Sequence, residues 1–101
     1  MRMLMTVKMA TGEFNAAVKN GNAGKIMNRI LEECRPEAAY FTDEDGQRTA
    51  ILVVNIDDPS QIPRFAEPWF LNFNASIQFK IAMTQEDLRK SGLDEIGKKW
   101  S

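Results

Sequence analysis

The sequence of 101 residues predicts one α+β domain, and three patterns support this fold class. An aromatic stretch and an aliphatic stretch flank an Asp-Gly turn, which is typical of a β-hairpin over residues 38–56. Apolar residues recur at helical spacing from Ile62 to Phe73. Apolar and polar residues then alternate from Ser76 to Met83, as in a strand with one buried face.

The region before the hairpin predicts a strand and two helical pieces. Residues 2–9 alternate between apolar and polar side chains except at Leu4, so they form a strand with one dry face. Thr11 can cap a helix that carries one apolar stripe, and a second stripe runs over residues 26–34. At about 100° per residue the two stripes point in nearly opposite directions. Glycines and asparagines in residues 20–24 explain this as a bend between two helices.

The second strand of the hairpin carries the strongest argument for a partner. Pro36 ends the helical region before it, because the residue that precedes a proline disfavours the helical conformation. Residues 50–54 are apolar at both parities, so both faces of this strand must be covered. A chain of this length cannot supply both layers, which predicts a second copy as the partner.

The remaining elements complete the order of the fold. Residues 57–60 form a turn that can cap the helix over residues 62–73, and Pro68 inside this helix predicts a kink or two short helices in line near Glu67. Residues 76–83 form the last strand.

A helical extension follows over residues 84–101. Thr84 and Asp87 form a variant of a capping box, and residues 91–92 interrupt the extension. We expect this extension to pack on the domain or on its partner.

The order strand, helix, strand, strand, helix, strand is the ferredoxin-like arrangement. It has a four-stranded antiparallel sheet with helices on one face. The open face would be half polar and half apolar, and burial of its apolar half favours a homodimer that packs sheet against sheet.

The amino-acid composition argues against several classes of function. A net charge of −1 argues against nucleic acid as a partner, and no apolar run is long enough to cross a membrane. The single cysteine, Cys34, allows no internal disulfide and fits a reducing compartment, the cytoplasm of a bacterial-type cell. The absence of histidine excludes Ser-His and Cys-His nucleophile pairs and most zinc sites. We predict no cofactor and no metal.

Two short motifs fail in detail. Residues 21–25 are like part of a phosphate loop, but they lack its first glycine and its final Ser or Thr, so a helix bend is the better interpretation. Residues 43–46 are like the middle of a calcium loop. Phe41 and Leu52 stand where two ligands belong, which indicates a solvated hairpin turn.

Tyr40, Asn55 and Trp69 are the candidate ligand-binding residues. Asn55 is the one polar residue of the aliphatic strand, and a ligand, a water or Tyr40 could supply its hydrogen bonds. In a catalytic site, Tyr40 and Asn55 would donate hydrogen bonds to a substrate oxygen, and Trp69, on the helix expected to cover them, would form an apolar wall. In the alternative interpretation Asn55 only ends the strand and both aromatic residues belong to the core.

Five runs within residues 36–88 carry a resemblance to a known family: Pro36–Phe41, Asp58–Pro63, Ala66–Phe70, Asn74–Ala75 and Met83–Leu88. They resemble an uncharacterised family of small bacterial proteins. The resemblance implies a ferredoxin-like chain of the dimeric α+β barrel type and brings no assigned reaction and no catalytic residue. At the level of the fold the chain is also similar to cofactor-independent monooxygenases, muconolactone isomerases and stress-responsive barrel proteins.

Two functions therefore stay open. The leading one is a homodimeric α+β barrel domain that binds a small molecule between its helices and its sheet, and such a site could also serve a cofactor-independent enzyme that acts on a small organic molecule. The second is a non-enzymatic dimer that serves as an interaction or regulatory module. The first requires a closed cavity beside Asn55, whereas the second predicts filled space there and a second exposed apolar patch.

Overall fold

The computed structural model describes residues 1–101 and has four strands, five α-helices and one 3₁₀ turn. In chain order the elements are β1 (Arg2–Lys8), α1 (Thr11–Lys19), α2 (Ala23–Cys34), β2 (Ala38–Glu44), β3 (Gln47–Asn55), the 3₁₀ turn η1 (Pro59–Gln61), α3 (Ile62–Phe73), β4 (Ser76–Ile81), α4 (Gln85–Lys90) and α5 (Leu93–Lys99). The α+β class is confirmed.

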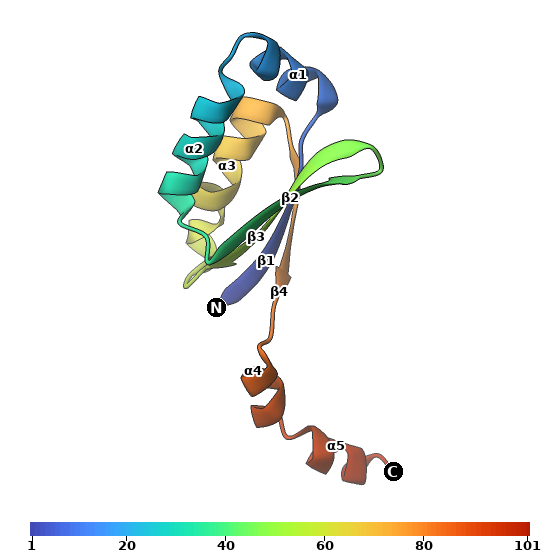
Figure 1. Ribbon diagram of the computed structural model, residues 1–101. Helices are drawn as coiled ribbons and strands as arrows, with labels where there is room; N and C mark the ends of the chain where they lie inside the picture. The colour runs from blue at the N-terminus through green and yellow to red at the C-terminus, as the bar shows by residue number, and fades with distance from the viewer.

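The four strands form one antiparallel sheet in the order β2-β3-β1-β4. Both β1 and β3 are central, as expected for the aliphatic strand. Helices α2 and α3 lie side by side along one face of the sheet, and α1 lies at one end of them (Figure 1). The predicted ferredoxin-like arrangement is thus consistent with the structure, and its second face has no covering layer within the chain.

The bend between α1 and α2 follows from its turn-forming residues. Gly21 has a φ of 79°, which a residue without a Cβ adopts at no steric cost. The N–H of Asn22 donates a hydrogen bond of 3.1 Å to the side-chain oxygen of Asn20. Helix α2 ends where Arg35 enters the left-handed region with a φ of 43°, just before Pro36.

The 3₁₀ turn η1, which leads directly into α3, begins at a capping box at Asp58, and α3 then runs without interruption. The Asp58 carboxylate accepts a hydrogen bond of 2.9 Å from the N–H of Ser60 and one of 2.6 Å from its hydroxyl. These bonds hold the pKa of Asp58 below its ordinary value, the hydroxyl bond contributing most. The helix continues through Pro68, so the expected division into two short helices does not occur.

The core lies between the sheet and the three covering helices. Alternate strand residues point into it, and Met5 is paired with Leu52 on one side and with Phe79 on the other. Met5 and Leu52 are completely buried, as are Trp69 and Phe73 of α3. Burial of each large apolar side chain contributes about 1.5–3 kcal/mol to folding, so this layer stabilises the body.

The C-terminal arm, residues 82–101 with α4 and α5, leaves the body at the end of β4 and extends away from it (Figure 1). The molecule is accordingly elongated, with a long axis of 59 Å against 28 and 19 Å. The sequence predicts that the arm packs either on its own domain or on a partner. It does not pack on its own domain (Figure 1). Its apolar side chains are exposed.

Candidate functional site

The structure does not bring Tyr40, Asn55 and Trp69 together. Trp69 is fully buried on the helix-covered face of the sheet. Tyr40 pairs with Ile51, whose neighbours in β3 point into the core, so Tyr40 lies on the uncovered face with 69% of its surface exposed. Asn55 is exposed at the end of β3. The expectation that α3, which carries Trp69, covers Tyr40 and Asn55 is therefore wrong. The binding of a ligand by these three residues stays a prediction.

The side chain of Asn55 finds its hydrogen-bond partners within the chain. Its Oδ1 accepts a bond of 2.8 Å from the amino group of Met1. Its Nδ2 donates a bond of 3.2 Å to the carboxylate of Asp57. The amide therefore needs no bond from Tyr40.

Aromatic side chains fill the space between the sheet and α3. The ring of Phe73 lies 4.8 Å from that of Phe14 and 6.3 Å from that of Trp69, centroid to centroid. The indole Nε1 of Trp69 is buried and has no hydrogen-bond acceptor. An unpaired buried donor costs about 1–3 kcal/mol. Among the buried side-chain nitrogen and oxygen atoms, Nε1 is the one that an added acceptor would satisfy.

The open face of the sheet divides into an apolar half and a polar half. In the apolar half, Leu4 of β1 pairs with Val53 of β3, which pairs with Ala38 of β2, and the next row continues with Ile51 and Tyr40. These five side chains form one continuous patch over three strands. The sequence-based expectation of a half-dry open face is confirmed by this register.

The polar half lies at the other end of the same face. A hollow of about 290 Å³ is lined there by Thr6, Lys8, Glu44, Ser76, Ile77 and Gln78. The ammonium group of Lys8 forms an ion pair of 3.2 Å with the exposed carboxylate of Asp45. An exposed pair of this kind contributes little free energy, so this half is a solvated surface.

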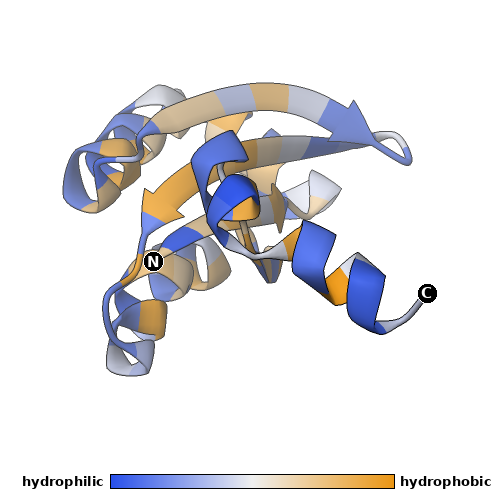
Figure 2. Cartoon of the chain, turned by 90° about the horizontal axis from the view of Figure 1, so that it is seen from below, coloured by the Kyte–Doolittle hydropathy of each residue, from blue (hydrophilic) through white to orange (hydrophobic).

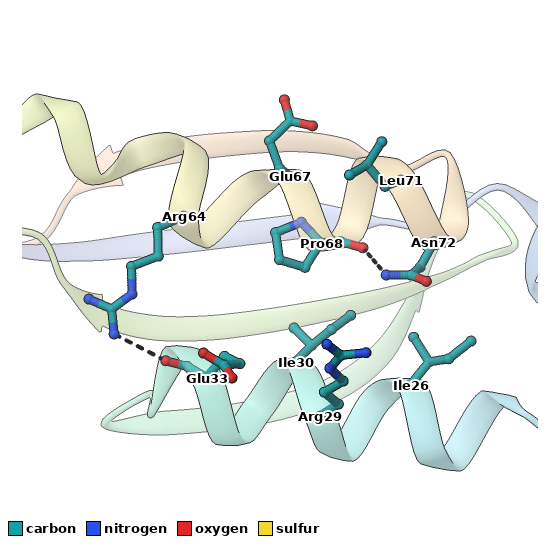
Figure 3. A pocket seen from close by; sticks show the side chains of 9 residues that line it. All are labelled: Ile26, Arg29, Ile30, Glu33, Arg64, Glu67, Pro68, Leu71 and Asn72. Carbon is teal, nitrogen blue, oxygen red and sulfur yellow. Dashed lines mark hydrogen bonds between the residues drawn. The ribbon is translucent and has the colours of Figure 1, made fainter.

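The largest groove of the body lies between α2 and α3, on their side away from the sheet (Figure 3). It has a volume of about 500 Å³ and is lined by Ile26, Arg29, Ile30, Glu33, Arg64, Glu67, Pro68, Leu71 and Asn72. The guanidinium of Arg64 donates a bond of 3.3 Å to the backbone oxygen of Glu33. None of the four charged side chains forms an ion pair with another.

This groove was not predicted from the sequence. The pattern of apolar residues in α3 predicts one buried face, and Phe65, Trp69 and Phe73 are indeed buried. Leu71 falls outside that face and is 81% exposed. An apolar residue off the buried stripe of α3 was the available signal, but the pairing of α3 with α2 that makes the groove is a tertiary contact.

The two segments that match a phosphate loop and a calcium loop only in part lie at turns in the structure. Residues 43–46 close the β2-β3 hairpin, with positive φ at Asp45 and Gly46. Residues 21–25 lie at the bend and at the start of α2. No group of three or more carboxylate, thiol or imidazole side chains is placed to hold a metal ion.

The contacts of Cys34 and Arg48 give both residues a structural role. Cys34 is a free, buried thiol, and burial raises its pKa. The guanidinium of Arg48 lies 4.7 Å from the centroid of the Phe14 ring and donates a bond of 2.8 Å to the side-chain oxygen of Asn15. A thiol with a raised pKa is a poor nucleophile.

No helix has the length and apolar character needed to span a lipid bilayer.

No family model matches the chain, and a search of curated proteins finds no relative either. The resemblance to small bacterial proteins therefore rests only on the short runs that carry it.

Proposed function

We propose that this chain is a homodimeric interaction module whose two copies meet through the open faces of their sheets. One observation carries the proposal: the continuous apolar half of a sheet face that no element of the chain covers. It consists of Leu4, Ala38, Tyr40, Ile51 and Val53.

Exposure of this apolar patch to water costs free energy. Apolar surface is stabilised on burial by about 25 cal/mol per Å², and monomers rarely expose patches above a few hundred Å². A sheet face with one apolar half and one polar half is suited to a two-fold contact, because each apolar half can face its own copy. The polar halves then stay solvated.

The filled core supports the interaction module over the small-molecule site. The space beside α3 is occupied by Trp69, Phe73 and Phe14. None of the three main surface hollows is lined by Tyr40 or Asn55. The second exposed apolar patch that this function predicts has a counterpart in the C-terminal arm, where Trp100 is 79% exposed.

We propose that the dimer is located in a reducing compartment, the bacterial cytoplasm. Its one cysteine, Cys34, is a free thiol. Stabilisation by burial between copies requires no disulfide.

Light scattering combined with size exclusion tests the dimer. We expect a dimer for the unmodified chain at micromolar concentration and a dissociation constant raised at least tenfold by Tyr40→Lys. Thr42→Lys is the matched control, since Thr42 lies two residues along β2 on the same face but outside the apolar half. A monomeric unmodified chain, or equal effects of both variants, would overturn the proposal.

One observation favours a second candidate, a small-molecule-binding domain that acts as a cofactor-independent enzyme. The unpaired Nε1 of Trp69 would donate a hydrogen bond to an oxygen of the ligand. Native mass spectrometry of the purified protein would show a bound mass, and Trp69→Phe would abolish it. A chain that carries no added mass would count against this candidate.

A further inference from the structure

The groove between α2 and α3 has an apolar floor. Ile30 is almost completely buried, and Ile26 and Pro68 are half-buried. Figure 3 shows Pro68 of α3 facing the two isoleucines of α2 across the gap. Figure 2 shows hydrophobic and hydrophilic residues mixed along the helices of the body. The floor can therefore hold an apolar group while the rim of the groove stays polar.

Two arginines enter the groove from its opposite walls. Arg29 of α2 and Arg64 of α3 both point into the gap (Figure 3). Arg64 bonds at 3.3 Å to the backbone oxygen of Glu33. Glu33 follows Arg29 by four residues, which is about 6 Å along a helix that rises 1.5 Å per residue. Because both arginine side chains are long, their guanidinium groups can contact one anion that lies between them.

The guanidinium of Arg64 is held in place and keeps free donors. Its bond to Glu33 uses one of the five N–H groups that a guanidinium carries. Its carbon also lies 5.7 Å from the centroid of the Phe65 ring. Arg29 forms no ion pair. Arginine N–H groups match the two oxygens of a carboxylate, so both side chains are suited to hold one.

Two glutamates in the groove limit the charge of the anion. Glu33 and Glu67 line it, and Figure 3 shows the Glu67 carboxylate pointing away from α2. With two arginines and two glutamates the groove is close to neutral. A phosphate group, with a charge of about −1.5 to −2 at neutral pH, would be repelled by Glu33 more strongly than a carboxylate of charge −1.

The charged and apolar ends of the groove are separated. Arg64 and Glu33 lie at one end, whereas Ile26 and Leu71 lie at the other (Figure 3). Leu71 is 81% exposed at the rim of that apolar end. The volume of about 500 Å³ is within the range of roughly 300–1,000 Å³ found for small-molecule sites. A molecule with a head and an apolar body matches this arrangement.

We propose that the groove between α2 and α3 binds a small organic acid, with its carboxylate between Arg29 and Arg64 and its apolar body on Ile26, Ile30 and Pro68. The groove lies on the side of the two helices away from the sheet. A dimer formed through the open face therefore leaves this site free in each copy.

Isothermal titration calorimetry of the full chain with octanoate tests the site. Octanoate has one carboxylate and an unbranched apolar chain. We expect saturable binding with one site per chain. 1-Octanol, which has the same chain without the charge, should bind at least about tenfold more weakly, because it lacks hydrogen bonds between charged groups. Inorganic phosphate, which has no apolar body, should give no saturable binding.

Single substitutions in the groove locate the carboxylate. Arg29→Gln and Arg64→Gln should each raise the dissociation constant for octanoate by about tenfold or more. Arg89→Gln is the matched control, since Arg89 lies outside the groove, on α4, where it pairs with Glu86. Glu33→Gln should lower the dissociation constant by about two- to fivefold, the scale of one exposed charge. A misfolded chain could not produce this gain.

Three outcomes would overturn the site. They are the absence of saturable octanoate binding, equal affinities for octanoate and 1-octanol, and equal effects of Arg29→Gln and Arg89→Gln. Amide NMR signals that octanoate shifts should belong to residues 26–33 and 64–72. Shifts confined to the open sheet face, residues 38–40 and 51–53, would equally refute binding in the groove.

Light scattering on the same samples separates this site from the dimer. A monomeric chain that binds octanoate in the groove would refute the dimer and keep the site. A dimer that binds no octanoate would refute the site and leave the dimer standing.

Discussion

The guanidinium carbon of Arg48 on β3 lies 4.7 Å from the centroid of the Phe14 ring on α1, and the same guanidinium bonds to Asn15 at 2.8 Å. These contacts hold the first helix against a central strand although the two residues are 34 positions apart in the chain. Phe14 in turn contacts Phe73, so Arg48 covers the outer end of the aromatic core.

Replacement of Arg48 by alanine should lower the free energy of unfolding by about 1 kcal/mol, the scale of an exposed cation–π contact with one hydrogen bond. Urea denaturation followed by circular dichroism measures the change. Arg29→Ala serves as the control because Arg29 is exposed on α2 and forms no ion pair. Equal losses for both variants would contradict a specific role of Arg48.

Trp69→Ala should lower the free energy of unfolding by about 3–5 kcal/mol, because it leaves a cavity in the core. Trp69→Phe should cost clearly less, since the Nε1 that it removes has no hydrogen-bond partner. Urea denaturation compares the two variants. A phenylalanine variant as unstable as the alanine variant would reveal an acceptor for the indole N–H.

The two tryptophans should report on separate parts of the molecule. Trp69 is fully buried and Trp100 is 79% exposed, so the emission of Trp100→Phe should lie at shorter wavelength and resist iodide quenching. The emission of Trp69→Phe should be quenched readily at low protein concentration. If the arm packs on a second copy, quenching of Trp100 should weaken as the concentration rises, and quenching that is independent of concentration speaks against that contact.

The Cys34 thiol should react slowly with Ellman's reagent in the folded chain. Burial raises its pKa, so the neutral thiol contributes stability that is fully present below the unfolded pKa and is lost as pH rises through the folded value. The urea midpoint should therefore decline in the alkaline range, and Cys34→Ala should lack this part of the decline. A reaction rate equal to that in urea would show that the thiol is accessible.

The cap of η1, the 3₁₀ turn that leads into α3, should weaken in acid. Hydrogen bonds from Ser60 lower the pKa of Asp58, so the carboxylate contributes stability that is present above the unfolded pKa of about 4 and is lost as pH falls through the lower folded value. Urea midpoints measured from pH 6 to pH 2 should fall less steeply for Asp58→Asn, since asparagine keeps the cap without titrating. Parallel curves for the two chains would exclude Asp58 as a source of the acid sensitivity.

Local patterns were sufficient to predict the elements of the body. Alternation in β1 and β4, the glycine bend at residue 21 and the cap at Asp58 each depend on neighbours within a few positions. The half-apolar open face followed from the same alternation. The prediction of two short helices at Pro68 was wrong, because the packing of α3 on the sheet keeps the helix whole despite one missing backbone bond.

The candidate site could not be predicted in the same way. A slip of one residue in the pairing of β2 with β3 would turn Tyr40 toward the helices, and only the register with Ile51 decides its face. Asn55 obtained its partners from Met1 and Asp57, one of which is 54 residues away. The groove between α2 and α3 depends on how two helices pack.

The sequence by itself determined the order of strands and helices and the periodicity of their apolar residues, because both arise from backbone geometry and short-range burial patterns. Only the tertiary structure decided that Trp69 and Tyr40 lie on opposite faces of the sheet and that the C-terminal arm extends away from the body (Figure 1). Strand register and helix packing set these positions, and both are sums of contacts between residues distant in the chain.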